Sequence, residues 1–110
     1  MNQKDEKLKE IIRALAADYF SRESNRQSLI TVTNIDLRNR ASKAIILITV
    51  LPEDKEQSAL EFAQRQLSEF REYVMKNSRI QRVPFFEARL DVGEKNRQRM
   101  DEIGKLGDTK

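Results

Sequence analysis

One run of residues in this chain, Ala44 to Leu51 (AIILITVL), is apolar on both of its alternating faces. One face carries Ala44, Ile46, Ile48 and Val50, and the other carries Ile45, Leu47 and Leu51. Side chains of a strand alternate between the two faces of a sheet, so the run predicts a strand over 43–51 in the middle of its sheet. Pro52 ends this strand, because proline has no N–H to donate to a neighbouring strand. The run is far shorter than the roughly 20 apolar residues of a membrane span, so we expect no membrane segment.

The segments around this strand predict the remaining elements. Residues 5–20 and 54–76 show apolar residues at helical spacing, whereas residues 29–37 and 85–90 have the character of strands. The polar stretch 38–42 (RNRAS) predicts a turn. The order is helix, strand, strand, helix, strand, which predicts an α+β fold. We expect residues 1–92 to form one domain and 93–110 to be a tail that either holds a short helix or is mobile.

The composition excludes several kinds of active site. The chain of 110 residues has no cysteine and no histidine, which rules out thiolate catalysis, disulfides and Cys or His metal sites. The carboxylates Glu53, Asp54 and Glu56 are explained by the start of a helix, where the helix dipole favours negative charge. We therefore expect no enzyme activity and no cofactor. The polar N-terminus is not a secretory signal, so we expect a cytoplasmic protein.

Positive charge is concentrated in two parts of the chain. The formal net charge is +3, and residues 21–43 alone carry five basic and two acidic side chains. Further basic residues precede the third strand. Arginine matches phosphate oxygens well, so we predict a phosphate-contacting patch. Its members are Arg38, Arg40, Lys43, Lys76, Arg79 and Arg82. The alternative is an ordinary solvated surface.

The adjacent pair Phe85 and Phe86 opens the predicted third strand. Neighbouring strand residues point to opposite faces, so one ring should lie in the core and the other can be exposed. An exposed Phe85 would be able to stack on a base. The alternative is that it packs under the C-terminal tail.

Several short motifs, taken in order, resemble a known family. They are TVTNIDLRNRASKAIILITVLPED (31–54), Phe70-Arg71, Arg82-Val83-Pro84, Asp91 and Arg99-Met100-Asp101. This set is similar to bacterial ribosome-binding factor A over residues 8–103. The resemblance implies a type II KH-like fold, with a three-stranded mixed sheet and helices packed on one face. It also implies a monomeric, non-enzymatic factor that binds the small (30S) ribosomal subunit and its 16S ribosomal RNA. Such factors act in rRNA processing and late ribosome biogenesis, especially at low temperature.

The sequence lacks one feature of ordinary KH domains and departs from the family pattern at two places. No glycine precedes Gly93, so the GXXG loop with which ordinary KH domains grip a nucleotide backbone is absent. The Ala-x-Gly kink of the family is replaced by Leu67-Ser68-Glu69, which predicts either one continuous helix or a kink at Ser68 with another cause. The family's basic opening is replaced by Lys4, Lys7 and Lys9.

Two other functions remain open from the residues alone. The sheet face with Ile45, Leu47 and Leu51 would serve a protein-interaction module if it were partly exposed. A generic KH-like RNA-binding protein is the other alternative.

Overall fold

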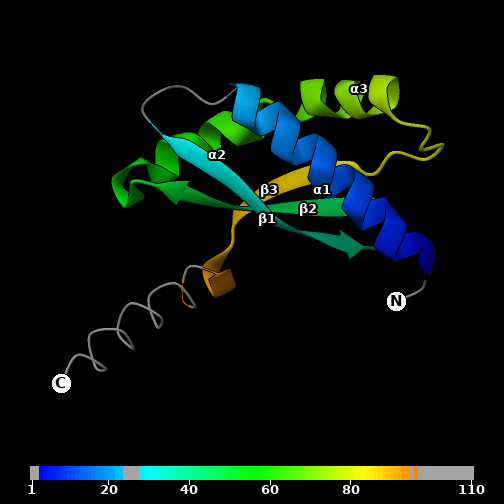
Figure 1. Ribbon diagram of the computed structural model, residues 1–110, viewed down its shortest axis with the longest axis horizontal. Coiled ribbons are helices and arrows are strands. Elements are labelled where there is room, and N and C mark those ends of the chain that lie inside the picture. The colour runs from blue at the N-terminus through cyan, green and yellow to red at the C-terminus, as the bar shows by residue number, and fades with distance from the viewer. Residues whose placement is uncertain (1–2, 24–27, 95, 97–110) are drawn as a thin grey trace.

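The computed structural model describes residues 3–23, 28–94 and 96. It confirms the α+β fold class, with a three-stranded mixed sheet covered by helices (Figure 1). The elements, in chain order, are α1 (Gln3–Glu23), β1 (Leu29–Arg38), β2 (Lys43–Leu51), the 3₁₀ turn η1 (Glu53–Lys55), α2 (Glu56–Arg65), α3 (Leu67–Asn77) and β3 (Phe85–Leu90).

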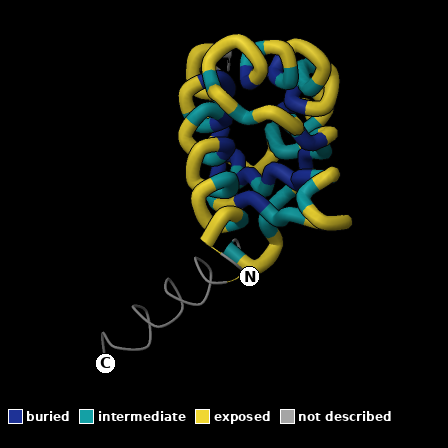
Figure 2. The backbone as a smooth tube through the Cα atoms, turned by 90° about the vertical axis from the view of Figure 1, so that its right-hand side faces the viewer, coloured by how far each residue is buried: buried dark blue, intermediate teal, exposed yellow. Residues whose placement is uncertain are grey.

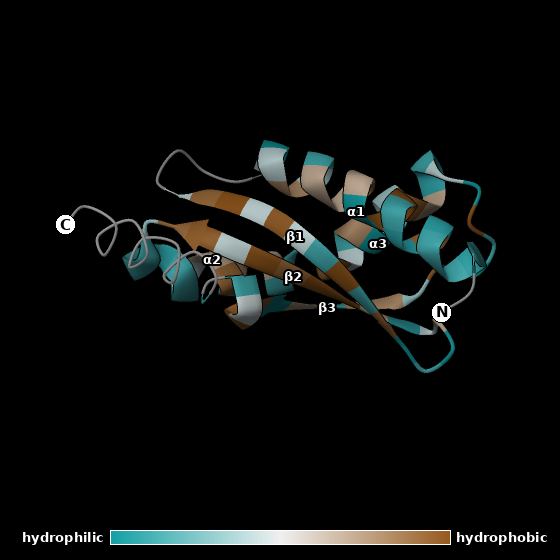
Figure 3. Ribbon diagram, turned by 60° about the horizontal axis from the view of Figure 1, so that its bottom comes forward, coloured by the Kyte–Doolittle hydropathy of each residue, from teal (hydrophilic) through white to brown (hydrophobic). Residues whose placement is uncertain are grey.

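The strand that is apolar on both faces, β2, lies in the centre of the sheet as predicted. The strand order is β1-β2-β3, with β2 antiparallel to β1 and parallel to β3. Figure 3 shows β2 as hydrophobic along most of its length between its two neighbours. The predicted bounds of β2 and β3 agree with the structure, and β1 extends one residue further, to Arg38.

The helices α1, α2 and α3 pack against one face of the sheet. On that face β2 contributes four buried side chains, Ala44, Ile46, Ile48 and Val50. They share one hydrophobic core with buried residues of α1, α2 and α3, among them Ile12, Ala63 and Val74. Figure 2 shows the buried residues inside the domain and the exposed ones around its outside. None of α1, α2 and α3 contributes to a core on the second face of the sheet.

Aromatic side chains connect α1 and α3 to the start of β3. The ring of Phe70 in α3 lies 5.4 Å from that of Tyr19 and 5.4 Å from that of Phe20, both in α1. It also lies 4.9 Å from the ring of Phe86 in β3. Such tilted ring pairs add attraction beyond the area that they bury. Phe86 is therefore the core member of the Phe85-Phe86 pair.

The helical region after Pro52 is broken at Gln66, so both predictions for it are wrong. It is neither one helix over 54–76 nor kinked at Ser68, because α2 ends at Arg65 and α3 begins at Leu67. The N–H of Gln66 donates to the carbonyls of Ala63 and Phe62 at 3.1 and 3.2 Å. Its side-chain Oε1 accepts a hydrogen bond of 3.0 Å from the hydroxyl of Tyr19, which ties the break to α1.

The change of direction at Gln66 leaves Ala63 of α2 and Phe70 of α3 both buried in the core.

The predicted tail lies mainly outside the described residues. A helical segment begins at Val92, directly after β3 and Asp91. Residues 95 and 97–110 are not described, and neither is the motif Arg99-Met100-Asp101. The boundary near residue 92 stays a prediction.

Candidate nucleic-acid interface

Four parts of the chain meet at one end of the sheet. Arg38 at the end of β1 pairs with Lys43 at the start of β2, and Lys43 pairs with Phe85 at the start of β3. The β1–β2 turn, the α3–β3 connection and the start of β3 therefore lie side by side. Figure 1 shows the N-terminal end of α1 and the α3–β3 connection at this same end, on the right. We call this part of the molecule the basic end. It carries Lys4, Lys7, Arg38, Arg40, Lys43, Arg79 and Arg82.

The β1–β2 turn presents Arg40 to solvent. Three consecutive residues, Asn39, Arg40 and Ala41, have positive φ values of 54°, 56° and 65°. The N–H and the hydroxyl of Ser42 both donate to the carbonyl of Asn39, at 3.1 and 2.8 Å. The carbonyl of Ser42 accepts a hydrogen bond of 3.0 Å from the N–H of Phe85, which joins the turn to β3. Arg40 is exposed and forms no ion pair within the part of the chain that the structure describes.

Arg38 and Lys43, by contrast, are held by carboxylates. Arg38 Nη2 lies 2.8 Å from Asp36 Oδ2, and this partner raises the pKa of the Arg38 guanidinium. Lys43 Nζ lies 2.9 Å from Glu87 Oε2, and Arg89 Nε lies 2.8 Å from Glu87 Oε1. Both charges are therefore partly neutralised before any ligand arrives. The sequence pattern placed Arg38, Arg40 and Lys43 in one patch. The structure distinguishes them, because Arg38 and Lys43 form ion pairs and Arg40 forms none among the described residues.

These ion pairs lie beside Ile45, on the second face of β2. Ile45 points to the sheet face without a helix, yet it is only 2% exposed. Its cross-strand neighbours are Asp36 and Glu87. The paired side chains of Arg38 and Lys43 adjoin the same two carboxylates, so their aliphatic parts are placed to exclude water from Ile45.

The α3–β3 connection, residues 78–84, carries Arg79 and Arg82 on its exposed side. Arg71 of α3 fixes this connection from inside. Its Nε donates to the carbonyl of Pro84 at 3.2 Å, and its Nη2 donates to the carbonyl of Val83 at 3.0 Å. At the start of the connection, the hydroxyl of Ser78 donates to the carbonyl of Val74 at 2.8 Å. Arg79 and Arg82 therefore project from a held backbone.

Lys76 lies apart from the other predicted members. It lines a shallow hollow on the helical side, together with Tyr19, Tyr73, Glu69 and Glu72. In that hollow the hydroxyl of Tyr73 donates to Asp18 at 2.7 Å, and this bond raises the pKa of Tyr73. The surroundings of Lys76 are thus rich in carboxylates, unlike those of Arg40.

The structure adds two lysines that the predicted patch did not include. Lys4 and Lys7 of α1 lie beside Arg79, around a hollow whose apolar lining is formed by Leu8, Ile11 and Ile80. The sequence showed these lysines at the start of a helix, where they replace the family's basic opening. Nothing in their spacing indicated that they would adjoin a residue more than 70 positions later.

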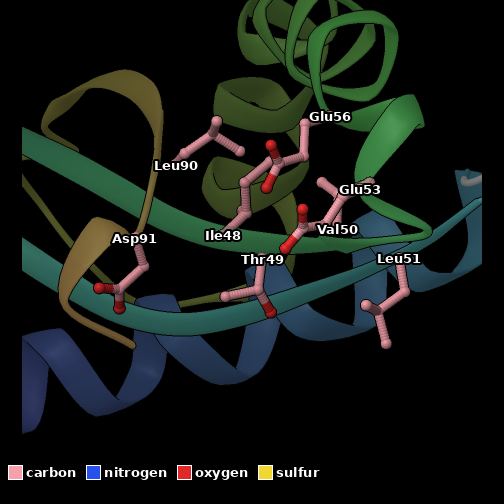
Figure 4. Close-up of a pocket in the computed structure, with 8 residues that line it drawn as sticks. All are labelled: Ile48, Thr49, Val50, Leu51, Glu53, Glu56, Leu90 and Asp91. Atoms are coloured by element: carbon pink, nitrogen blue, oxygen red, sulfur yellow. The ribbon is translucent and has the colours of Figure 1, made fainter. Parts of the chain in front are cut away.

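The opposite end of the sheet is acidic. Figure 4 shows a small pocket there, with the carboxylates of Glu53, Glu56 and Asp91 around the ends of β2 and β3. Asp91 is held in place, because its Oδ1 accepts a hydrogen bond of 2.9 Å from the N–H of Glu94 and its Oδ2 accepts one from the hydroxyl of Thr33. No cluster of three or more acidic residues suited to a metal ion occurs within 3–23, 28–94 and 96. Charge thus changes sign along the sheet, and phosphate would be repelled from this end.

The described part of the chain contains no helix that is long and apolar enough to cross a membrane.

Comparison with known proteins gives matches in structure only. No protein-family model and no curated protein matches the sequence. The crystal structure of ribosome-binding factor A from Thermus thermophilus matches with a TM-score of 0.67 and 19% sequence identity, over 76% of this chain and 90% of that chain.

The chain has the ribosome-binding factor A fold.

A second solved structure has the same fold. The solution NMR structure of a Thermotoga maritima protein, proposed to be a ribosome binding factor A, matches with a TM-score of 0.54 and 16% identity, over 76% of this chain and 79% of that chain. The resemblance seen in the sequence motifs is thereby confirmed at the level of the ribosome-binding factor A fold. This fold accounts for the element order.

Proposed function

We propose that this protein is a ribosome-binding factor A-type factor that binds the small ribosomal subunit and its 16S rRNA during maturation. The observation that carries the proposal is the ribosome-binding factor A fold over 90% of the length of the Thermus protein. The basic end supplies the chemistry that such a role needs, because positive side chains that neutralise phosphates dominate affinity for RNA. The protein would act as a monomer in the cytoplasm by binding and not by catalysis. We expect its contribution to rRNA processing and ribosome biogenesis to be largest in the cold.

The proposed RNA contacts are the predicted patch together with the two lysines of α1. Within this set, Arg40, Arg79 and Arg82 should contribute most, since they are exposed and have no ion pair among the described residues. Arg38 and Lys43 would first have to exchange a carboxylate for a phosphate. Lys76 would contribute least, because Glu69 and Glu72 share its surroundings.

Co-sedimentation with purified small subunits, large subunits and whole ribosomes, over a series of salt concentrations, tests this function. We expect preference for free small subunits and a steep loss of binding with salt. Replacing Arg40, Arg79 and Arg82 together by alanine should weaken binding roughly tenfold or more. The matched control is Lys55→Ala, which removes one positive charge at the acidic end, in η1. Equal binding to all particles, or affinity that does not change with salt, would contradict the proposal.

A protein-interaction module is the second candidate function, and one observation favours it. Leu29 and Leu51 are direct cross-strand partners on the sheet face without a helix, and they are 57% and 59% exposed. Adjacent exposed leucines are typical of interaction surfaces. Ile45 does not take part, because it is buried. Light scattering after size exclusion tests this candidate: a monomer at all concentrations, with no binding of a hydrophobic dye, would remove it.

A further inference from the structure

The ring of Phe85 is unusual for its position in the sheet. Among the described residues it is the large apolar side chain with the greatest exposure, 68%. Its neighbour Phe86 already supplies the core contact, against Phe70. Phe85 is therefore not needed for the core. A single exposed phenyl ring is common in proteins, so exposure alone carries no conclusion.

The second observation is that Arg71 holds this exposed ring in place. The guanidinium carbon of Arg71 lies 4.4 Å from the centre of the Phe85 ring, in a cation–π contact. The same guanidinium donates to the carbonyls of Val83 and Pro84, the two residues before Phe85. The side chain of Arg71 thus fixes both the backbone before Phe85 and the ring of Phe85. Arg71 occupies one face of the ring, and the exposure of Phe85 leaves the other face to solvent.

The charges around the ring indicate what kind of ligand would use that face. Lys43 is the cross-strand partner of Phe85, and the turn that carries Arg40 is hydrogen-bonded to its N–H. Arg82 lies three residues before it. These cations favour a ligand that carries negative charge beside a flat face. They suit a planar base that carries a phosphate on either side.

We propose that Phe85 is a stacking site for an unpaired base of single-stranded RNA. This rests on the proposed function and adds to it the kind of RNA that the basic end receives. Only an unpaired base exposes a full face, and aromatic rings accept such faces with little dependence on sequence. Phosphates next to the base would lie near Arg40 and Arg82. A duplex would engage the cations and not the ring.

The alternative for Phe85, packing under the C-terminal tail, stays a prediction, because residues 95 and 97–110 lie outside the described part of the chain. The chain leaves β3 at Leu90, the opposite end of the strand from Phe85. The two positions are separated by about 17 Å, at about 3.3 Å per residue. The ring is exposed at the end where the cations are, and the chain leaves at the acidic end.

The absence of tryptophan from the sequence allows a direct test. In Phe85→Trp the new indole is the only one in the chain, and its fluorescence reports stacking. The matched control is Val92→Trp, at an exposed position (62%) just beyond the far end of the same strand. Each variant is titrated with a short unstructured RNA, with an RNA duplex and with polyphosphate, which has charge and no bases. Filter retention measures binding of the RNAs in parallel.

We expect quenching of the indole at position 85 by the single-stranded RNA, and little or no quenching by the duplex or by polyphosphate. The indole at position 92 should respond to none of them. If the single-stranded RNA is retained and the indole at position 85 does not respond, the stacking site is wrong while RNA binding stands. An equal response to polyphosphate would also overturn it. If neither RNA is retained by either variant or by the unchanged protein, the proposed function itself fails.

An affinity measurement on Phe85→Leu provides the second readout. Leucine keeps apolar bulk and removes the aromatic face, so affinity for single-stranded RNA should fall about tenfold, whereas affinity for polyphosphate should not change. The melting temperature should stay near that of the unchanged protein, because the ring is exposed. Unchanged affinity for the single strand in Phe85→Leu would overturn the stacking site.

Discussion

Glu87 shows how one residue adjusts the charge of the candidate interface. Its Oε2 lies 2.9 Å from Lys43 Nζ, and its Oε1 lies 2.8 Å from Arg89 Nε. The contact with Lys43 and the hydrogen bond from Arg89 hold the pKa of the Glu87 carboxyl below 4.5, its ordinary value. The Oε2 atom is buried although the residue lies on the open sheet face, so it depends on Lys43 for compensation. Glu87 therefore keeps Lys43 in place and limits its availability to a ligand.

The direction of this pKa shift predicts an acid-sensitive contribution to stability. Because the folded state lowers the pKa of Glu87, its contribution is present above pH 4.5 and is lost as pH falls below that value. Glu87→Gln should therefore lower stability near neutral pH and flatten its decline between about pH 5 and 3. Urea unfolding at several pH values measures this. The control is Glu72→Gln on the exposed side of α3, which should keep the original profile. A Glu87→Gln profile parallel to that of the unchanged protein would contradict the assignment.

In the β1–β2 turn, the backbone conformations that the residues prefer differ most from those that the fold requires. Positive φ at Asn39 is common, but at Arg40 and Ala41 a side chain must occupy a conformation that costs roughly 1–2 kcal/mol per residue. The hydrogen bonds of Ser42 and Phe85 hold the turn in this form. The turn has to connect paired strands and pass beside β3, and that requirement overrides the preference of the individual residues.

Glycine at position 41 should therefore stabilise the protein. Glycine adopts positive φ without steric cost, and after allowing for its greater freedom in the unfolded chain we expect a gain of about 0.5–1 kcal/mol for Ala41→Gly. Equilibrium unfolding in urea measures the change. In the control, Ala14→Gly on the exposed side of α1, the same substitution should cost about 1 kcal/mol. Loss of stability in both variants would show that the turn relaxes in solution.

At the scale of the whole molecule, charge is divided between the two ends of the sheet. The basic end carries residues from α1, the β1–β2 turn and the α3–β3 connection, and the acidic end carries Glu53, Glu56 and Asp91. The separation of positive from negative charge influences the binding of an anionic partner more than the net charge of +3 alone suggests. It would orient the protein on an RNA surface with the start of β3 toward the phosphates.

The salt dependence of RNA binding measures how many of these charges contact phosphate. For single-stranded RNA, each contact contributes roughly 0.7 to the slope of log affinity against log salt. Replacing Arg40, Arg79 and Arg82 by alanine should therefore reduce the slope by about 2. Lys55→Ala at the acidic end should leave it unchanged. A slope that is the same in the unchanged protein and in the triple variant would exclude these three residues as phosphate contacts.

The sequence by itself determined the three strands of this protein, the central position of β2 and the helical character of the segments before and after the first two strands. Alternation in Ala44–Leu51 specified a central strand, and helical spacing specified which segments are helical, because burial of apolar faces depends on local periodicity. The same local signals showed that one ring of Phe85-Phe86 belongs to the core, without showing which.

Only the tertiary structure decided how distant residues combine. The break at Gln66 is joined to α1 by a hydrogen bond from Tyr19, and this contact is not visible in the pattern of the helix itself. The ion pair that occupies Lys43, and the position of Lys4 and Lys7 beside Arg79, join residues far apart in sequence. Charge can be counted along a chain. Whether a charge is free, neutralised or placed beside an exposed ring depends on distances in space, and these are fixed only when the core packs.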